Sequence, residues 1–555
     1  MRIADCGLRI QKTRSCLLTR NPQSAIRNLL VALLLITTFL SACGPRRTPN
    51  LERIFAGARE HKGKRPIIVI PGILGSRMVN RRTGEVVWPS VFRSDVDGLS
   101  LPTTPDLDAN RDDLVASRIV ETAKLAKIAP EVYVYHYLLR ALEDYGGYRE
   151  GDWDNPPEGG DRDTFYVFPY DWRRDNVESA RLLVRRVEAL KLRLGRPDLR
   201  FNIVAHSMGG LVARYAAMYG DRDLPPEGTE PKPDWRGASF VNKIFMFGTP
   251  NEGSMEAFAT LLGGYSVTEG TRTRLRLFNK LSREDVMTAP SIFQLLPHRA
   301  EARFLDEHLR PLSLDLYDPA VWRRYHWSAA NDPAFREAYA RGEPHGLESP
   351  TRKGTLAELD AYFEVVLKRA RRFHEALDAL DNSVNARDAS ANAPDTSANA
   401  TDALTSAPVK LYAFGGDCEE TLSAPVVLRD EKRGRWLTLI RPKSLRASDG
   451  RRFERAEVLH AMFEPGDGRV TRASLLGLDL AGARASLFYA TPLPVAYAAF
   501  TCDLHSDLQN NMLKKRAARF RFTHRLRNAT AETLRRDPRG ELCVAPKISL
   551  HRRSL

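Results

Sequence analysis

Ser207 is the side chain in this sequence with the clearest signal for chemistry. It follows an apolar, β-prone run at 201–205 and precedes small residues and a helical pattern. Such a strand-turn-helix layout holds a serine in a strained conformation with its Oγ exposed. The positions two residues either side must be small because the two backbones pass close together, and Ala205 and Gly209 meet that requirement. The pattern predicts a nucleophile at Ser207; the alternative is a tight turn without chemistry.

A serine nucleophile needs an imidazole to take its proton and a carboxylate to fix the tautomer of that imidazole. With this kind of turn, the acid and the histidine follow the serine in that order. Asp467 lies between two glycines, which allow a tight, exposed turn, and His505 follows it. We therefore expect Ser207, Asp467 and His505 to act together. An Asp-Gly turn without chemistry is the alternative for Asp467.

Other residues compete for these two roles. Asp417 could supply the carboxylate, but it follows a strand that comes too early in the chain. His460 precedes the acid and breaks the order, and His524 lies in a basic run, where an exposed histidine is the ordinary interpretation. His206 is adjacent to the serine, and neighbours in a strand point to opposite faces. We expect His206 to orient the turn or to face the core.

The sequence also indicates where an oxyanion could be held. A continuous β-branched run at 67–70 ends in Pro-Gly, which is typical of a buried strand. A glycine-rich turn after an early strand can supply one backbone N–H to an oxyanion, and the residue after the nucleophile supplies another. We expect these donors to be the N–H groups of Ile73 and Met208. A turn that only ends the strand is the alternative.

The elements around these residues alternate between strand and helix. Short apolar strands in such an alternation favour a mostly parallel sheet covered on both faces, an α/β class. Residues 251–380 are mostly helical, which predicts a cap inserted between strands of the sheet. Strands are expected at 67–70, 165–173, 201–205, 241–250, 409–416 and 436–440, and helices at 132–145 and 177–194.

The beginning of the chain predicts a compartment. A basic leader precedes a hydrophobic stretch at 29–40 that is too short to span a bilayer stably, and this is typical of a secretory signal peptide. The run that ends in Cys43 resembles a bacterial lipobox, in which that cysteine is lipidated and begins the mature chain. An ordinary signal with a free cysteine is the alternative. Gly44 is not acidic, which favours the outer membrane of a Gram-negative-type envelope, facing the periplasm.

Composition limits the classes of partner. Hydrophobic residues make up 43% of the chain and charged residues 28%, as in a globular protein with a large core. The formal net charge of +15 suits an anionic membrane surface at least as well as nucleic acid, and no nucleic-acid motif is present. No Cys/His spacing resembles a zinc site. Cys418, Cys502 and Cys543 are an odd number for an oxidising compartment, so a disulfide such as Cys418–Cys502 is possible.

With these residues placed, the chain resembles the lecithin:cholesterol acyltransferase family, as a bacterial lipoprotein member. The matching segments follow one another in family order over roughly residues 65–510. They are Pro-Gly-Ile-Leu-Gly-Ser (71–76), Pro-Tyr-Asp-Trp-Arg (169–173), Ala-His-Ser-Met-Gly-Gly (205–210), Gly-Thr-Pro (248–250), Pro-Ser-Ile-Phe-Gln-Leu-Leu-Pro (290–297), Asp-Leu-Tyr-Asp-Pro (315–319) and Gly-Asp-Gly-x-Val (466–470).

The resemblance implies an α/β-hydrolase core with a helical cap. Its serine accepts an acyl group from a glycerolipid, such as a phospholipid, and passes it to an alcohol or to water, without metal or cofactor. The family roles fall on Ser207, Asp467 and His505. Mammalian members have a cysteine pair around a lipid-binding loop, whereas this chain has no cysteine at 44–417. A lipase, phospholipase or esterase that uses only water is the first alternative, and a non-catalytic envelope lipoprotein is the second.

The expected organisation has seven parts. They are a lipoprotein signal peptide (1–42), a tether (43–63), the first part of the α/β-hydrolase core (64–250), a helical cap (251–382), a disordered linker (383–408), the second part of the core (409–513) and a basic C-terminal segment (514–555).

Overall fold

The computed structural model describes residues 51–89, 98–124, 131–266, 280–299, 302–341, 355–379, 408–477, 493 and 495–510. The predicted signal peptide with Cys43, nearly all of the predicted linker, and the predicted basic C-terminal segment with His524 and Cys543 lie outside these residues. In the part of the chain that is described, no helix combines the length and the apolar character needed to cross a membrane.

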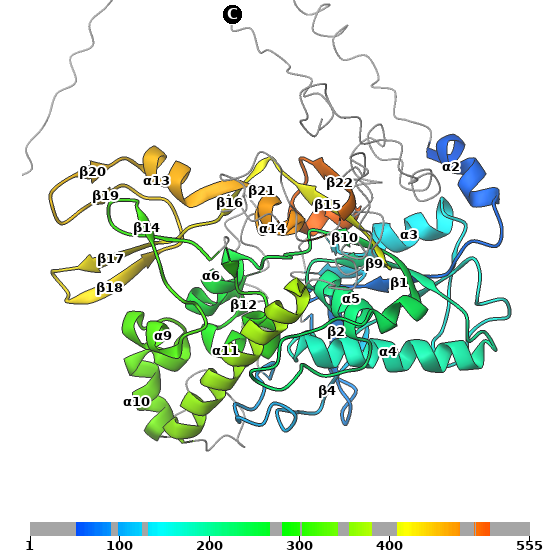
Figure 1. Cartoon of the computed structure of the whole chain (residues 1–555), viewed down its shortest axis with the longest axis horizontal. Helices are drawn as coiled ribbons and strands as arrows, with labels where there is room; N and C mark the ends of the chain where they lie inside the picture. Colours follow the sequence, from blue (N-terminus) through cyan, green and yellow to red (C-terminus); the bar gives the residue numbers. More distant parts are fainter. Residues whose placement is uncertain are drawn as a thin grey trace, which may run out of the picture. The chain divides into compact units, whose positions relative to one another are not determined.

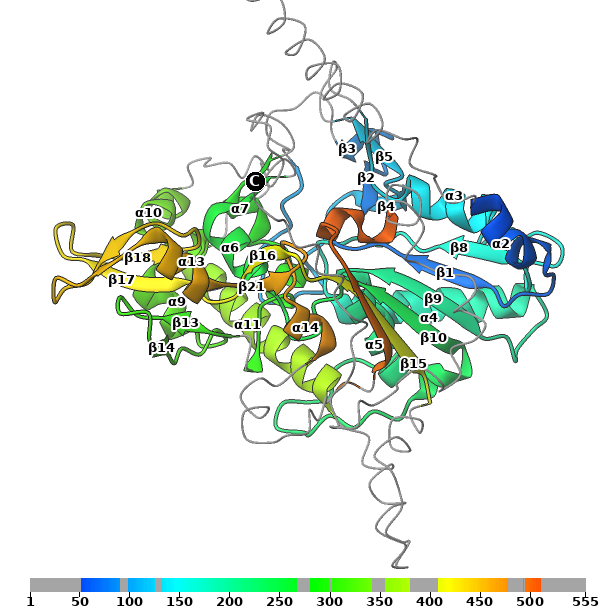
Figure 2. The ribbon, with the colours of Figure 1, turned by 90° about the horizontal axis from the view of Figure 1, so that it is seen from above.

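A seven-stranded sheet organises the fold, in the order β22-β15-β10-β9-β1-β8-β7 (Figure 1 and Figure 2). All of its neighbouring strands are parallel, which confirms the predicted α/β class. The strands are β1 (Ile67–Ile70), β7 (Arg149–Glu150), β8 (Thr164–Val167), β9 (Phe201–His206), β10 (Val241–Phe247), β15 (Lys410–Gly416) and β22 (Val495–Thr501).

Helices cover both faces of this sheet. Alternate residues of β1 belong to different hydrophobic clusters, because successive side chains of a strand point to opposite faces. Ile67 and Val69 pack with α3 (His136–Asp144), whereas Ile68 and Ile70 pack with α4 (Asn176–Arg193) and α5 (Met208–Tyr219). A strand buried on both faces needs a continuous apolar run, and this explains why β1 could be recognised in the sequence.

The expected helices are present with shifted ends. Helix α4 differs from the predicted 177–194 by one residue at each end, and it begins where the Asp175 side chain accepts a hydrogen bond from the Val177 N–H. Helix α3 starts later than predicted, because 131–133 form the short strand β6. Part of the predicted tether is also helical. Residues Leu51–Glu60 form α2, whose Phe55 is buried against Tyr145.

One predicted strand belongs to a different sheet. We expected the strand at 436–440 to continue the main sheet, but β18 (Arg435–Leu439) pairs antiparallel with β17 (Val426–Asp430) in a four-stranded sheet with β13 and β14. The prediction was wrong because the residue pattern of a strand does not encode its partner. The main sheet ends instead with β22, whose half-buried edge residues gave no strong apolar signal.

Many further helices and strands lie outside the main sheet. Between β1 and β8 are β2 (Ser76–Asn80), β3 (Val86–Trp88), β4 (Leu114–Ile119), β5 (Thr122–Lys124) and β6 (Glu131–Tyr133). Before and after β10 are η1 (Arg236–Ser239), α6 (Met255–Gly263), β11 (Tyr265–Ser266), β12 (Lys280–Leu281), α7 (Arg283–Val286), α8 (Pro290–Phe293), β13 (Phe304–Leu305), β14 (Pro311–Leu312), α9 (Pro319–Tyr325), η3 (Ala329–Asn331), α10 (Pro333–Arg341) and α11 (Leu356–Asp378). After β15 are β16 (Glu419–Leu422), β17, β18, β19 (Leu445–Arg446), β20 (Arg452–Phe453), α13 (Arg455–Met462), β21 (Phe463–Gly466), α14 (Arg472–Leu476) and, beyond β22, η5 (His505–Asn510).

Candidate active site

Ser207 lies at the turn between β9 and α5, as the sequence predicted. Its backbone has φ 52° and ψ −127°, a conformation that costs a non-glycine residue free energy and is typical of sites where strain serves function. The Ser207 N–H donates to the Phe247 carbonyl oxygen at 2.7 Å, which ties the turn to strand β10. A Cβ atom at Gly209 would lie 2.5 Å from the Pro71 carbonyl oxygen, so this position has no room for a side chain.

Asp467 lies in the tight turn that follows β21. Its Oδ1 accepts hydrogen bonds from the backbone N–H groups of Arg469 and Val470, at 3.0 and 2.8 Å. Its main-chain carbonyl oxygen accepts from the N–H of His505 at 2.9 Å. These bonds hold the buried carboxylate in one orientation and leave Oδ2 free to face the histidine.

His505 connects the acid to the serine. Its Nδ1 lies 2.8 Å from Asp467 Oδ2, and its Nε2 lies 2.9 Å from Ser207 Oγ. An ionised carboxylate can only accept, so Nδ1 carries the hydrogen and Nε2 is left to accept the hydroxyl proton. The three side chains are buried. The structure therefore brings together all three residues that the sequence singled out, in an arrangement that can deprotonate a serine.

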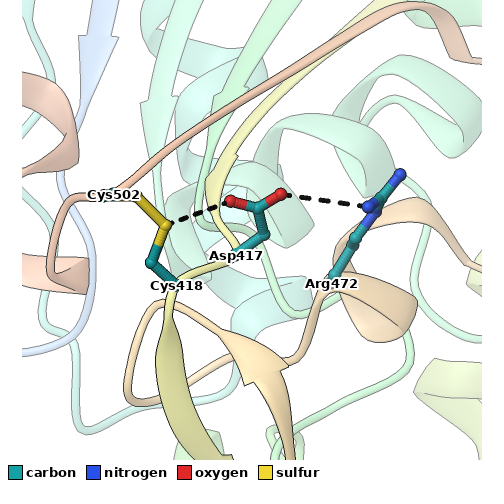
Figure 3. The surroundings of a disulfide bond; sticks show 4 residues. All are labelled: Asp417, Cys418, Arg472 and Cys502. Atoms are coloured by element: carbon teal, nitrogen blue, oxygen red, sulfur yellow. Dashed lines mark hydrogen bonds and ion pairs between the residues drawn. A yellow bond between two sulfur atoms is a disulfide. The ribbon is translucent and has the colours of Figure 1, made fainter. Parts of the chain in front are cut away.

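Two of the competing residues, Asp417 and His460, lie away from the serine. Asp417 is placed between the disulfide and Arg472: its Oδ1 is 3.6 Å from Cys418 Sγ and its Oδ2 is 3.9 Å from the Arg472 guanidinium (Figure 3). His460 is exposed on α13. Neither is hydrogen-bonded to Ser207 or His505 in the part of the chain that the structure describes. His505 is the residue that meets the serine, and Asp467 meets His505.

Cys418 and Cys502 form a disulfide, the pairing that the sequence left open (Figure 3). Their Cα atoms are 5.0 Å apart. The bond joins the ends of the neighbouring strands β15 and β22, and Cys502 lies only three residues before His505. The disulfide therefore fixes the start of the loop that carries the histidine.

Among the residues that the structure describes, the two expected oxyanion donors have no hydrogen-bond partner. Neither the Ile73 nor the Met208 N–H donates a hydrogen bond to another described residue. Met208 is the first residue of α5, where a helix leaves its N–H groups unsatisfied. A Cβ atom at Gly72 would lie 2.8 Å from Ser207 Cβ, so the loop that contains Ile73 runs directly against the serine.

Sequence reasoning missed Tyr135. Its buried hydroxyl lies 2.8 Å from His206 Nδ1 and accepts a hydrogen bond from the Gly72 N–H. His206 in turn has its Nε2 3.0 Å from the His505 carbonyl oxygen. Burial, and then the nearby His505, lower the pKa of His206 to about 3, so its imidazole is neutral. No local pattern marks Tyr135, because all of these contacts are distant in the sequence.

Two groups of side chains in the described part of the chain have the composition of a metal site. Asp417, Cys418 and Cys502 form one, but both sulfurs are used by the disulfide. Glu252, His298 and Asp378 form the other. There the Arg299 guanidinium lies 3.4 Å from Glu252 and 3.3 Å from Asp378, which supplies the positive charge that the two carboxylates need. We therefore interpret this second group as an ion-pair network.

Comparison with known proteins agrees with the resemblance seen in the motifs. Residues 116–330 match the family model described as lecithin:cholesterol acyltransferase. Over this region the chain is similar to the lecithin:cholesterol acyltransferase family. The match includes Ser207 and Met208 and ends before Asp467 and His505. It supports an enzyme that acts on acyl esters of lipids.

Three solved structures also match the chain. The Tle4-Tli4 complex is 14% identical over 82% of this chain and 97% of that one, with a TM-score of 0.46. EstA from Clostridium botulinum is 12% identical over 84% and 87%, with a TM-score of 0.25. Aspergillus fumigatus lipase B is 11% identical over 58% and 64%, with a TM-score of 0.17. No curated protein matches the chain.

Proposed function

We propose that the protein is a serine-dependent O-acyltransferase of the lecithin:cholesterol acyltransferase type, acting on acyl esters of glycerolipids. The observation that carries this proposal is the hydrogen-bond chain from Ser207 Oγ through His505 to Asp467 at a strained strand-to-helix turn. The family match over 116–330 supplies the lipid acyl ester as the substrate class. Ser207, Asp467 and His505 are the proposed catalytic residues.

The first half of the reaction forms an acyl-enzyme. Ser207 Oγ attacks the ester carbonyl carbon while its proton passes to His505 Nε2. The carbonyl oxygen becomes an oxyanion that accepts hydrogen bonds from the N–H groups of Ile73 and Met208. Asp467 holds the Nδ1–H and stabilises the imidazolium. The bond to the glycerol oxygen then breaks, and that oxygen leaves with the proton from His505.

The second half transfers the acyl group. An acceptor hydroxyl gives its proton to His505 and attacks the acyl carbon, which releases Ser207 with its proton restored. An alcohol acceptor gives a new ester, and water gives a free fatty acid. Both products come from one site, so the ratio between them depends on whether the alcohol outcompetes water there.

Product analysis tests this proposal. Purified protein is incubated with phospholipid vesicles that contain a long-chain alcohol, and free fatty acid and new ester are measured beside Ser207→Ala. We expect wild type to make the ester and the variant to make neither product. Free fatty acid alone would make the protein a lipase or phospholipase. No product from wild type, or equal product from the variant, would contradict a serine enzyme.

We also propose that the protein is a lipoprotein of the cell envelope, anchored by a lipidated Cys43 to the outer membrane and facing the periplasm. The hydrophobic stretch at 29–40 and the lipobox-like sequence support this. The net charge of +15 suits contact with anionic lipid. Incorporation of a palmitate analogue into wild type and not into Cys43→Ser is the expected result, and equal labelling would contradict it.

A further inference from the structure

A buried chain of hydrogen bonds joins the oxyanion loop to the backbone of the candidate base. The Gly72 N–H donates to the Tyr135 hydroxyl oxygen at 2.8 Å. That hydroxyl lies 2.8 Å from His206 Nδ1, and His206 Nε2 lies 3.0 Å from the His505 carbonyl oxygen. His206 directly precedes Ser207. The chain of hydrogen bonds therefore connects the oxyanion loop, the nucleophile turn and the segment that carries the candidate base.

The direction of every bond follows from its end groups. The His505 carbonyl can only accept, so His206 carries its hydrogen on Nε2 and its Nδ1 must accept. Tyr135 therefore donates to Nδ1, while its oxygen accepts the hydrogen of Gly72. Burial raises the pKa of Tyr135 and lowers that of His206, so both side chains stay neutral. Each of the three donors in this chain of hydrogen bonds, the Gly72 N–H, the Tyr135 hydroxyl and the His206 Nε2–H, therefore has one acceptor.

The backbone beside Tyr135 also holds the helix that begins at His505. The carbonyl oxygen of Val134 accepts hydrogen bonds from Gln509 Nε2 at 2.9 Å and from Asn510 Nδ2 at 2.6 Å. Residues 134 and 135 thus contact the oxyanion loop, the strand before the nucleophile and the helix η5. One short segment between β6 and α3 therefore makes hydrogen bonds with three segments that are far apart in the sequence.

The same bonds determine which N–H groups remain for an oxyanion. The Gly72 N–H is used by Tyr135, so the next one along the loop, on Ile73, is left without a partner among the described residues. The loop is therefore anchored one residue before the proposed donor. A shift of this anchor would move the Ile73 N–H relative to Ser207 and His505.

We propose that Tyr135 and His206 are positioning residues that align the Ile73 N–H with the imidazole of His505. Neither side chain touches the substrate in the proposed reaction. The inference rests on the proposed function, because the alignment of these groups matters only if the proposed reaction takes place. Misplacing a reacting group by about 1 Å can cost on the order of 100-fold in rate, so one lost bond in this chain is expected to affect turnover.

Tyr135→Phe tests the inference, with Tyr170→Phe as the matched control. Both tyrosines are buried, and the Tyr170 hydroxyl donates to the Pro71 carbonyl of the same loop at 3.0 Å without contacting His206. We expect Tyr135→Phe to lower kcat by about 10- to 100-fold with little change in KM and in melting temperature. Tyr170→Phe should stay within about 3-fold of wild type. Equal losses of kcat in the two variants would show that Tyr135 only packs against the loop, and this would overturn the inference.

Variants of His206 test the second link. In His206→Gln the amide nitrogen lies near the position of Nε2 and can still donate to the His505 carbonyl. In His206→Asn the side chain is too short to reach it. We expect His206→Gln to retain more kcat than His206→Asn. The double variant Tyr135→Phe/His206→Asn should lose no more than the worse single one, because the two residues act as a unit. Losses that multiply would contradict a continuous chain.

The outcome also separates this inference from the proposed function. Suppose that wild type is active, Ser207→Ala is inactive, and Tyr135→Phe has the kcat of wild type. This result would contradict the positioning role of Tyr135 and leave the proposed function intact. Wild type that forms no product and no covalent adduct would contradict both, since no reaction would then exist to be aligned.

Discussion

In the part of the chain that the structure describes, two buried histidines, His505 and His298, each bind a carboxylate, and their second partners differ. His505 is bound to Asp467 at 2.8 Å, and His298 to Asp378 at 2.9 Å. His505 binds its carboxylate through Nδ1 and turns Nε2 to the Ser207 hydroxyl. His298 uses Nε2 for its carboxylate, and its Nδ1 has no partner among the described residues.

The charges around the two pairs differ as well. Asp467 accepts hydrogen bonds from backbone N–H groups, which do not neutralise its negative charge. This charge can therefore stabilise an imidazolium at His505. Around His298, Glu252 and Asp378 share the Arg299 guanidinium, and Asp378 is the last residue of α11. We infer that the first pair serves proton transfer. The second ties the end of α11 to the loop after β10 and serves stability.

The largest expected difference comes from removing each imidazole. We expect His505→Gln to lower kcat/KM by about 10⁴-fold or more, because the proton of Ser207 then has no acceptor. His298→Gln should leave kcat/KM of the folded protein within about 3-fold of wild type. Ester hydrolysis rates, corrected for the folded fraction by circular dichroism, give the comparison. Comparable losses in the two variants would remove the distinction between the pairs.

Removing the carboxylates should separate activity from stability. We expect Asp467→Asn to reduce kcat by roughly 10³- to 10⁴-fold, because an amide no longer fixes the histidine tautomer. Asp378→Asn should instead lower the free energy of unfolding by about 2 kcal/mol, since it removes the charge of a partly buried ion pair. Denaturant titration and steady-state kinetics on both variants measure the two quantities. An unstable Asp467→Asn with normal kcat would reverse the assignment.

Acid should weaken the second pair. Burial alone would raise the pKa of Asp378, but the hydrogen bond and charge of His298 and the charge of Arg299 lower it to about 2. A lowered pKa stabilises the fold above the unfolded value, and this contribution is lost as pH falls from about 4 to about 2. The difference in unfolding free energy between wild type and Asp378→Asn should therefore shrink between about pH 6 and about pH 3. If the difference in unfolding free energy between the two proteins stays constant over this pH range, the ion pair of Asp378 is not its cause.

Glu252 is expected to give the smallest effect, with the opposite sign. Burial raises its pKa to about 7, against the lowering effect of His298. A carboxyl with a raised pKa contributes stability at low pH and loses it as pH rises through about 7. Glu252→Gln should thus gain about 1 kcal/mol relative to wild type between about pH 5 and about pH 8. Melting curves at the two pH values measure this, and a relative loss would show that the charged form is the stabilising one.

Local patterns predicted the parts of the site that are themselves local. The turn at Ser207 and the glycines around Asp467 carry their signal within a few residues. His505 was found by chain order, and the same order rejected His460. The parallel sheet followed from continuous apolar strands such as β1, which must be buried on both faces.

The features that were missed depend on partners distant in sequence. Tyr135 looks like any aromatic residue near a helix until Gly72 and His206 are placed around it. Strand β18 has an ordinary strand pattern, and only its pairing with β17 assigns it to the smaller sheet. Pairing of strands and closure of long loops are decided by packing of the whole chain, which no short window contains.

We propose that Ser207 is the nucleophile that His505 and Asp467 activate. Reacting the protein with a fluorophosphonate and locating the adduct by peptide mass spectrometry decides whether it has this role. We predict one adduct, on Ser207, that forms with wild type and Tyr170→Phe, forms far more slowly with His505→Gln and Asp467→Asn, and is absent from Ser207→Ala. An adduct on another residue, or none on the folded wild-type protein in the presence of lipid, would exclude Ser207 as the nucleophile.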